Sequence, residues 1–370
     1  MPVATSHQEP TILFLIDGLS GGGAERVVLT LAGAIAQQGH HVTLISLRCE
    51  CAYSIPHGVD YHLLEDHYRG PAWRQTEIWR RARALDAFLV THFENKRIRL
   101  AFSHLPKTDR IVASSRYLKE SWMCLHCALS RGELENKHGL QRLRKRHQLI
   151  KTYQGRKLIT VSEALQEDVR AIGIQPKALM TIYNPLDLDY VRRLAEEKSP
   201  FEHEKFILHV GRFNKQKRHD RLFEAFKLSG YPGKLLLLGS GSPQEKEKLE
   251  LLARKLQIDE RIIFLGFLKN PYCVMRASEA LVLSSDYEGL PNVLVEALAC
   301  RTQVVSTNCP FGPSEILQGP LAQGLCECEP SSLAEAIHRV LKSPVDITPE
   351  MIAPFLLSQS VTRYLALEAE

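Results

Sequence analysis

Two glutamates eight residues apart, Glu288 and Glu296, have the spacing that most clearly indicates chemistry in this sequence. Glu288 lies in a loop after the apolar run 280–283, and Glu296 lies about two turns into a helix expected over residues 291–300. Because Pro291 stands at the expected first helical position, the amides of residues 292–294 are left to meet an anion. The two carboxylates can then meet different parts of one polar ligand. Taken alone, two acids at this spacing also fit an ordinary solvated surface.

Two cations, Arg212 and Lys217, follow a second buried apolar run over residues 206–210. Ligands of open parallel sheets bind at the carboxyl ends of the strands, which is where this basic segment lies. Arginine offers a planar fork to phosphate oxygens, and lysine offers a point charge. The segment therefore indicates a phosphate-binding loop, with a solvated basic turn as the alternative.

A glycine-rich loop containing Gly21 and Gly22 connects a buried strand, residues 11–16, to a helix expected over residues 24–38. Glycines let a ligand approach the backbone, and the start of a helix favours an anion. The dinucleotide-binding fingerprint requires glycine or alanine at position 26, where Arg26 stands, so an NAD-dependent oxidoreductase is disfavoured. A tight turn without a ligand is the other interpretation.

The elements around these residues alternate between strand and helix in two successive series. The second series has strands expected at 206–210, 234–238, 261–265, 280–283 and 303–306, and helices at 219–228, 243–256, 291–300 and 331–341. A chain of 370 residues accommodates two domains. We therefore predict an α/β protein of two doubly wound, Rossmann-like parallel-sheet domains facing across a ligand-binding cleft. The first comprises residues 1–187, joined by a C-terminal helix at 353–370, and the second residues 188–352, with 191–199 as a connector.

These motifs together resemble those of retaining glycosyltransferases of family 4, which have the GT-B fold. The stretch 284–300 is very similar to the donor-site strip of that family. Residues 305–316 resemble its continuation in members that build lipid-linked glycans, lipopolysaccharide and other surface polysaccharides. The resemblance extends over about residues 11–320.

The resemblance implies a role for each matching residue. Arg212 and Lys217 would bind the donor diphosphate, and Glu296 would bind the ribose. Glu288 would contact the donor sugar and act in catalysis. The remaining donor-binding residues implied are Gly21 and Gly22 at the phosphate, Phe267 and Leu268 near the base, and Leu290, Asn292 and Val293 with their amides on the phosphate. No cofactor and no metal are expected, since Arg212 and Lys217 supply positive charge for the leaving diphosphate.

One histidine is also expected in the catalytic site. His126, at the end of the apolar run 123–127, resembles the first-domain histidine that reaches the donor sugar. A core histidine with satisfied hydrogen bonds is an equal alternative at this position, and His104 is a rival for the same role.

Charge is distributed unevenly along the chain. Residues 1–185 have a net charge of +8 and residues 186–370 a net charge of −3. Seven of the seventeen residues 141–157 are lysine or arginine, with Leu143, Leu149, Ile150 and Tyr153 expected to share part of one helical face. Such a helix is typical of peripheral contact with an anionic membrane, although it also fits an ordinary surface helix. Nucleic acid is disfavoured because no recognition motif accompanies the charge.

The sequence shows no apolar run long enough to cross a bilayer and no signal-peptide pattern, so a cytoplasmic location at the inner face of the cytoplasmic membrane is expected. The nine cysteines fit reduced thiols. The Cys-x-Cys pairs 49/51 and 326/328 and Cys124/Cys127 are too far apart in the sequence to favour zinc.

We therefore expect a glycosyltransferase that moves a hexose or N-acetylhexosamine from a nucleotide sugar, a UDP-sugar in the first instance, to a lipid-linked glycan or lipopolysaccharide, with retention of configuration. A catalytically silent nucleotide-sugar-binding scaffold or sensor on the same fold is the alternative.

Overall fold

A computed structural model describes residues 10–49, 53–93 and 97–370. The chain forms two compact units, one up to Pro185 together with Leu357–Glu370, and one over Leu186–Leu356. The crossings predicted from the sequence, at 187/188 and 352/353, lie a few residues away. The chain passes between the units where Leu186 and Leu356 pair in a parallel bridge, and the Leu186 amide donates to the Phe355 carbonyl.

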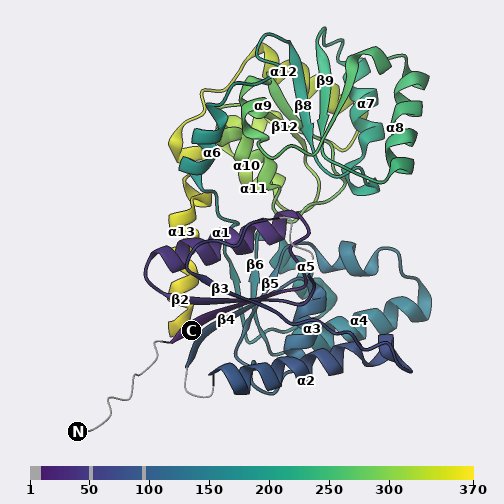
Figure 1. Ribbon diagram of the computed structural model, residues 1–370. Coiled ribbons are helices and arrows are strands. Elements are labelled where there is room, and N and C mark those ends of the chain that lie inside the picture. Colours follow the sequence, from purple (N-terminus) through teal and green to yellow (C-terminus); the bar gives the residue numbers. More distant parts are fainter. Residues whose placement is uncertain (1–9, 50–52, 94–96) are drawn as a thin grey trace. The chain divides into compact units, whose positions relative to one another are not determined.

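The first unit is built on a seven-stranded sheet in the order β3-β2-β1-β4-β5-β6-β7, and all of its neighbouring strands are parallel (Figure 1). Its strands are β1 (Thr11–Ile16), β2 (His41–Ser46), β3 (Val59–Leu63), β4 (Ile98–His104), β5 (Trp122–Leu125), β6 (Lys157–Thr160) and β7 (Ala178–Thr181). The central strand β1 is buried throughout, as its uninterrupted apolar sequence requires.

Helices cover both faces of this sheet. Helix α1 (Gly23–Gln37) and the C-terminal helix α13 (Leu357–Ala366) pack on one face, with Val361 and Tyr364 of α13 in the same core as Phe102. The other face is covered by α2 (Trp73–Phe93), α3 (Pro106–Ser114), α4 (Gly139–Tyr153) and α5 (Ala164–Ile172). The C-terminal segment thus completes the first core.

The second unit is built on a six-stranded parallel sheet in the order β10-β9-β8-β11-β12-β13. Its strands are β8 (Phe206–Val210), β9 (Lys234–Leu238), β10 (Ile262–Gly266), β11 (Ala280–Leu283), β12 (Gln303–Thr307) and β13 (Leu325–Cys326). The order of the strands reverses between the neighbouring central strands β8 and β11. The loops that follow these two strands therefore lie side by side at the carboxyl ends of the strands.

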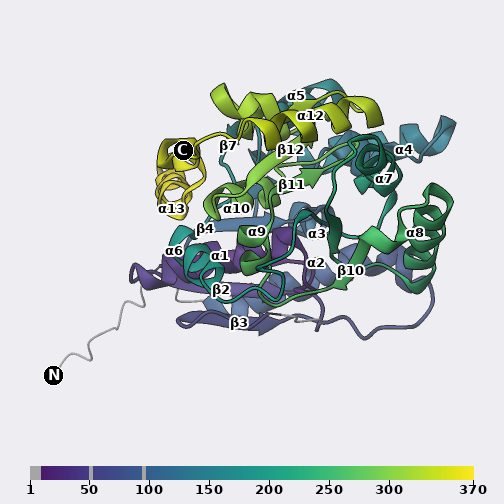
Figure 2. The same ribbon diagram turned by 90° about the horizontal axis from the view of Figure 1, so that it is seen from above.

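One face of the second sheet packs against α7 (His219–Leu228), α8 (Pro243–Leu256) and α12 (Pro330–Lys342). In the view of Figure 2, α6 (Leu188–Ala195), α9 (Tyr272–Ala277) and α10 (Asn292–Ala299) lie together, away from α8. A further short helix, α11 (Pro313–Ile316), follows β12. The prediction of two Rossmann-like parallel-sheet domains is confirmed.

Two predicted elements are wrong. Residues 191–199 are not a connector throughout, because α6 occupies Leu188–Ala195; the Asp187 side chain caps it by accepting from the Tyr190 amide. The expected helical face of residues 141–157 is also divided. Leu149 and Tyr153 of α4 are in the core, Leu143 is 63 % exposed, and Lys157 lies in β6.

Across the described ranges, none of the helices is both long enough and apolar enough to span a membrane.

Candidate functional site

The loops after β8 and β11 bring together most of the charged residues predicted for the second domain. Lys215–Lys217 forms a short helical turn whose cap is Asn214, since the Asn214 Oδ1 accepts from the Lys217 amide at 3.2 Å. Gly211 begins this loop at a close approach, because a Cβ atom there would lie 3.2 Å from both His209 Nε2 and Lys217 Cε. A side chain at position 211 would therefore crowd Lys217 and His209.

Lys217 and Glu288 form a direct ion pair. Lys217 Nζ lies 2.7 Å from Glu288 Oε1, and the two side chains are 14 % and 10 % exposed. The Ser285 hydroxyl donates to the same carboxylate oxygen at 2.5 Å, and the Glu288 amide donates to the Pro310 carbonyl. The structure thus brings the residue predicted to bind phosphate, Lys217, into contact with the residue predicted to bind the sugar, Glu288. It adds Ser285 to them, a residue that the sequence pattern does not single out.

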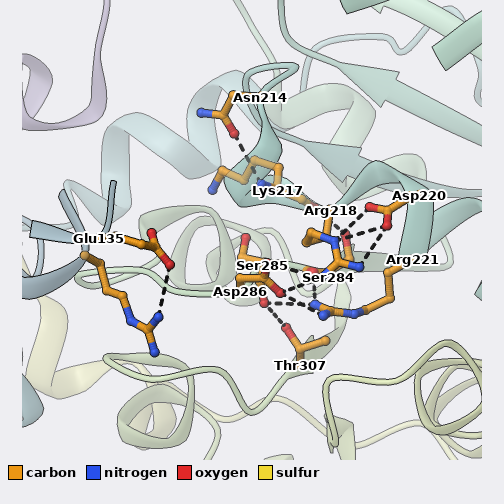
Figure 3. Close-up of polar contacts among 11 residues, drawn as sticks. Glu135, Asn214, Lys217, Arg218, Asp220, Arg221, Ser284, Ser285, Asp286 and Thr307 are labelled. Carbon is orange, nitrogen blue, oxygen red and sulfur yellow. Dashed lines mark hydrogen bonds and ion pairs between the residues drawn. The ribbon is translucent and has the colours of Figure 1, made fainter. Parts of the chain in front are cut away.

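A buried arginine supports the loop that carries Glu288. Figure 3 shows Arg221, from α7, with its guanidinium directed at residues 284–286. Its Nη1 donates to the Ser284 carbonyl at 2.8 Å, and its Nη2 lies 2.7 Å from Asp286 Oδ1. Arg218, 31 % exposed, also pairs with Asp286, and with Asp220.

Other predicted donor residues of the second unit lie at the surface. Arg212 is exposed, and within the described residues no carboxylate pairs with it. Phe267, 65 % exposed, follows the end of β10 at Gly266, and Leu268 beside it is half-buried. Arg212 and Phe267 are therefore accessible to a ligand.

The start of α10 differs from the expectation. Pro291 is the residue before the helix rather than its first residue, and the Leu294 amide donates to the Pro291 carbonyl, so that amide is not left for an anion. Leu290 is buried, whereas Asn292 and Val293 are half-buried. Glu296, in the same helix, lies with its Oε1 3.4 Å from the Tyr272 hydroxyl.

The glycine loop of the first unit already holds an anion of its own. The amides of Gly21 and Gly22 donate to Glu25 Oε2 at 2.6 and 2.8 Å, and Gly21 has a φ of 109°. Glu25 is the third residue of α1, so its carboxylate closes the helix start. In the structure described, Glu25 therefore takes the two amides of the glycines that the sequence places at the donor phosphate.

His104 and His126, which the sequence presents as rivals, contact each other. His104 is the last residue of β4, and His126 comes directly after the neighbouring strand β5. His104 Nδ1 lies 2.9 Å from His126 Nε2. Burial lowers the pKa of His126 to about 4 and lowers the pKa of His104 well below its usual value. Both rings are therefore neutral at pH 7, and one N–H lies in the bond between them.

No cluster of three or more histidine, cysteine or acidic side chains suited to a metal ion occurs in the described part of the chain. Cys124 is buried in β5, with its Sγ 3.7 Å from the Tyr364 hydroxyl. Cys51 lies outside the described residues. Asp187 and Asp189, two residues apart, begin α6, where Asp187 acts as the cap.

Two family models together cover nearly the whole chain. The model of glycosyltransferase family 4 matches residues 21–190, and that of glycosyl transferases group 1 matches residues 191–353. Their boundary falls beside the crossing between the two units. This chain belongs to the GT-B glycosyltransferases of the family 4 type.

Individual relatives agree with this assignment. An N-acetylgalactosamine-N,N'-diacetylbacillosaminyl-diphospho-undecaprenol 4-alpha-N-acetylgalactosaminyltransferase of Campylobacter jejuni is 29 % identical over 310 residues, covering 81 % of each chain. The amylovoran biosynthesis glycosyltransferase AmsD of Erwinia amylovora is 28 % identical over 332 residues, covering 83 % of each chain. The crystal structure of HepE from Anabaena in complex with UDP-glucose has a TM-score of 0.74 at 17 % identity, over 97 % of this chain and 99 % of that one.

Proposed function

We propose that this glycosyltransferase moves a hexose or N-acetylhexosamine from a UDP-sugar to a lipid-linked glycan or lipopolysaccharide acceptor, with retention of configuration. The observation that carries the donor part of the proposal is the Lys217–Glu288 pair at the carboxyl edge of the second sheet. A cation suited to phosphate and a carboxylate suited to sugar hydroxyls stand in contact there.

The donor diphosphate would bind at Arg212 and Lys217. Arg212 is exposed and can turn its fork to phosphate oxygens, while Lys217 Nζ exchanges its contact with Glu288 for one with phosphate. Glu288, kept in place by Ser285, then accepts hydrogen bonds from the sugar. In this scheme the ion pair positions both side chains before the donor binds, and it opens on donor binding.

The nucleoside would extend toward the loop after β10 and toward α10. Phe267 offers an exposed ring for stacking on a base, with Leu268 beside it, and Glu296 would accept from the ribose hydroxyls. Leu290, Asn292 and Val293 would bring the start of α10 to the phosphates, where helix N-termini favour anions. The choice of UDP follows HepE, whose structure was solved with UDP-glucose.

Transfer would break the bond between the anomeric carbon and the phosphate oxygen, with the electron pair leaving on UDP. The acceptor hydroxyl oxygen bonds to the anomeric carbon on the same face, and its proton passes to the departing phosphate oxygen. Arg212 and Lys217 stabilise the negative charge that develops there, so the scheme needs no metal ion. Glu288 and His126 would orient the sugar, and Glu288 would offset positive charge near the anomeric carbon.

The acceptor part of the proposal rests on relatives and on one surface of the first unit. The Campylobacter relative is named for a diphospho-undecaprenol acceptor and AmsD for amylovoran biosynthesis. Leu140 and Leu143 of α4 are 62 % and 63 % exposed, and the exposed cations of this helix lie around them: Arg142, Arg144, Arg146 and Lys151. Leucines surrounded by arginine and lysine fit an anionic membrane surface, at which a cytoplasmic enzyme would meet a lipid-linked acceptor.

Donor binding and transfer can be tested separately. We expect UDP-sugars, rather than GDP- or ADP-sugars, to raise the melting temperature of the purified protein. We expect Glu288→Gln to reduce transfer to a small residual rate while leaving the protein folded. Glu247→Gln, on the exposed surface of α8, is the matched control and should retain full transfer. Normal turnover by Glu288→Gln would refute the assignment, and UDP binding without transfer to any glycolipid would favour a binding scaffold.

The membrane contact has its own test. The double variant Leu140→Glu with Leu143→Glu should lose sedimentation with phosphatidylglycerol vesicles while retaining transfer to a short soluble acceptor. Leu228→Glu on α7, where the leucine is also 63 % exposed, is the control. Equal vesicle binding by both variants would show that α4 is not the contact.

A further inference from the structure

We infer that Arg221 is a positioning residue for Glu288: its buried guanidinium fixes the backbone of the loop whose serines hold Lys217 and Glu288. The inference rests on the proposed function, since it assigns to Arg221 an effect on transfer that passes through those two residues.

The burial and charge of Arg221 indicate a specific task. The residue is 5 % exposed, and a buried arginine is costly unless its charge and N–H groups find partners. Its partners all belong to one short segment: the carbonyls of Ser284 and Ser285, at 2.8 and 3.4 Å from Nη1, and Asp286 Oδ1, at 2.7 Å from Nη2. Its Nε finds no partner among the described residues, so the fork is used for this segment alone.

The segment that Arg221 holds is connected to the proposed site at each serine. The Ser284 hydroxyl donates to the Lys217 carbonyl at 2.7 Å, and the Ser285 hydroxyl donates to Glu288 Oε1 at 2.5 Å. Arg221 therefore fixes the backbone on which both of these hydroxyls are mounted. Figure 3 shows Arg221 and Thr307 both directed at residues 284–286.

Other contacts show how much of the support depends on Arg221. Thr307 also donates to the Ser285 carbonyl, at 2.7 Å, and Asp286 donates its amide to the Gln216 carbonyl at 2.9 Å. Among the described residues, Arg221 is the one that contacts both of these successive carbonyls and the following carboxylate. A lysine could keep the charge but not this fork of contacts, because a single ammonium group cannot occupy both guanidinium positions. We therefore expect the geometry of the guanidinium, and not the charge alone, to matter.

The expected effect falls on the chemical step. Small displacements of a positioned group reduce the rate far more than they reduce ligand binding, so Arg221→Lys should lower kcat by about 30-fold while the KM for the UDP-sugar changes by less than about threefold. Arg218→Lys is the matched control. Arg218 also pairs with Asp286, but it is 31 % exposed and, among the described residues, does not donate to the carbonyls of Ser284 or Ser285. The kcat of Arg218→Lys should therefore stay within about twofold of the parent.

The decisive measurement is a double-mutant cycle. If Arg221 acts through Glu288, then Arg221→Lys should change the residual kcat of Glu288→Gln by less than about twofold. Independent 30-fold effects that multiply in the double variant would overturn the inference. A merely structural role would lower stability in both backgrounds and would leave the two kcat effects multiplicative.

Failure of the inference can be told from failure of the proposed function. If Glu288→Gln transfers normally, the proposed function is wrong; if Glu288→Gln is inactive but Arg221→Lys is normal, only the inference is wrong. Should Arg221→Lys not fold, Thr307→Val removes the second bond to the Ser285 carbonyl from a nearly isosteric side chain. Its kcat should fall about threefold to tenfold at an unchanged KM, and an unchanged kcat would overturn the inference.

Discussion

Removing Lys217 should destabilise the second unit more than the loss of a surface cation does. Lys217→Met deletes the ammonium that lies 2.7 Å from Glu288 Oε1, while its unbranched chain preserves most of the packing. Breaking a buried pair on one side costs about 3–5 kcal/mol, because the remaining charge stays buried. Here the Ser285 hydroxyl still donates to Glu288, and the pair is 10–14 % exposed, so we expect a smaller cost of about 2 kcal/mol.

This cost converts to a measurable change in melting temperature. For a unit of the size of Leu186–Leu356, each kcal/mol corresponds to about 2–4 °C, so the second unit's transition should fall by about 4–8 °C. Scanning calorimetry without donor is the assay. The double variant Lys217→Met with Glu288→Gln should recover most of the loss, since it leaves no unpaired charge.

A surface pair in the same unit provides the control. Lys234 and Glu204 also form an ion pair, but their side chains are 42 % and 37 % exposed, so Lys234→Met should shift the transition by less than about 2 °C. Equal small shifts for Lys217→Met and Lys234→Met would show that Glu288 is solvated well enough to need no partner. That result would refute the reasoning that the pair stabilises the second unit before the donor binds.

Three further predictions concern titration and metal dependence. Burial raises the pKa of Asp109 to about 7. Between about pH 4 and 7 the folded protein therefore keeps a proton on Asp109 that the unfolded chain has released, so the free energy of unfolding should fall as the pH rises through this range. In urea titrations at about pH 5 and pH 8, Asp109→Asn should show a smaller fall than the parent. Burial lowers the pKa of His126 to about 4, so the unfolded chain binds the extra proton between pH 6.5 and 4; the parent should lose stability on acidification through that range, and His126→Gln should lose less in the same titration. Transfer should continue at an undiminished rate in excess EDTA, and activity restored only by added Mg²⁺ or Mn²⁺ would contradict the proposed metal-free scheme.

The sequence was most informative where a motif lies directly after a strand. The runs 206–210 and 280–283 predict β8 and β11 with their observed bounds. The sequence alone therefore places the loops that carry Lys217 and Glu288 at the carboxyl ends of two strands of one parallel sheet. The pairing of Lys217 with Glu288 could not be foreseen, because it depends on the order of strands in the sheet. Parallel strands that are neighbours in space are separated here by 69 residues between Val210 and Ala280.

Local patterns do not show which partner a residue takes within its own segment. Gly21 and Gly22 have the pattern of an anion site, and in the described structure their amides donate to Glu25, four and three residues away. Residues 191–199 are strongly charged and were predicted as a connector, but Val191 and Ala195, four residues apart, are enough to anchor α6. Nothing in the helical pattern around Arg221 distinguishes it from a surface arginine, and only the burial of its guanidinium in the structure does so.

The C-terminal helix has a consequence for how the protein is made. Val361, Tyr364 and Leu367 belong to the same core as β1, yet they are synthesised only after the whole of the second unit. The second unit is continuous in sequence and can fold as soon as its own residues have emerged, whereas the core of the first stays incomplete until α13 has emerged. A chain truncated before Leu357 would therefore contain a first unit that lacks α13, with an apolar face exposed at Phe102 and Cys124.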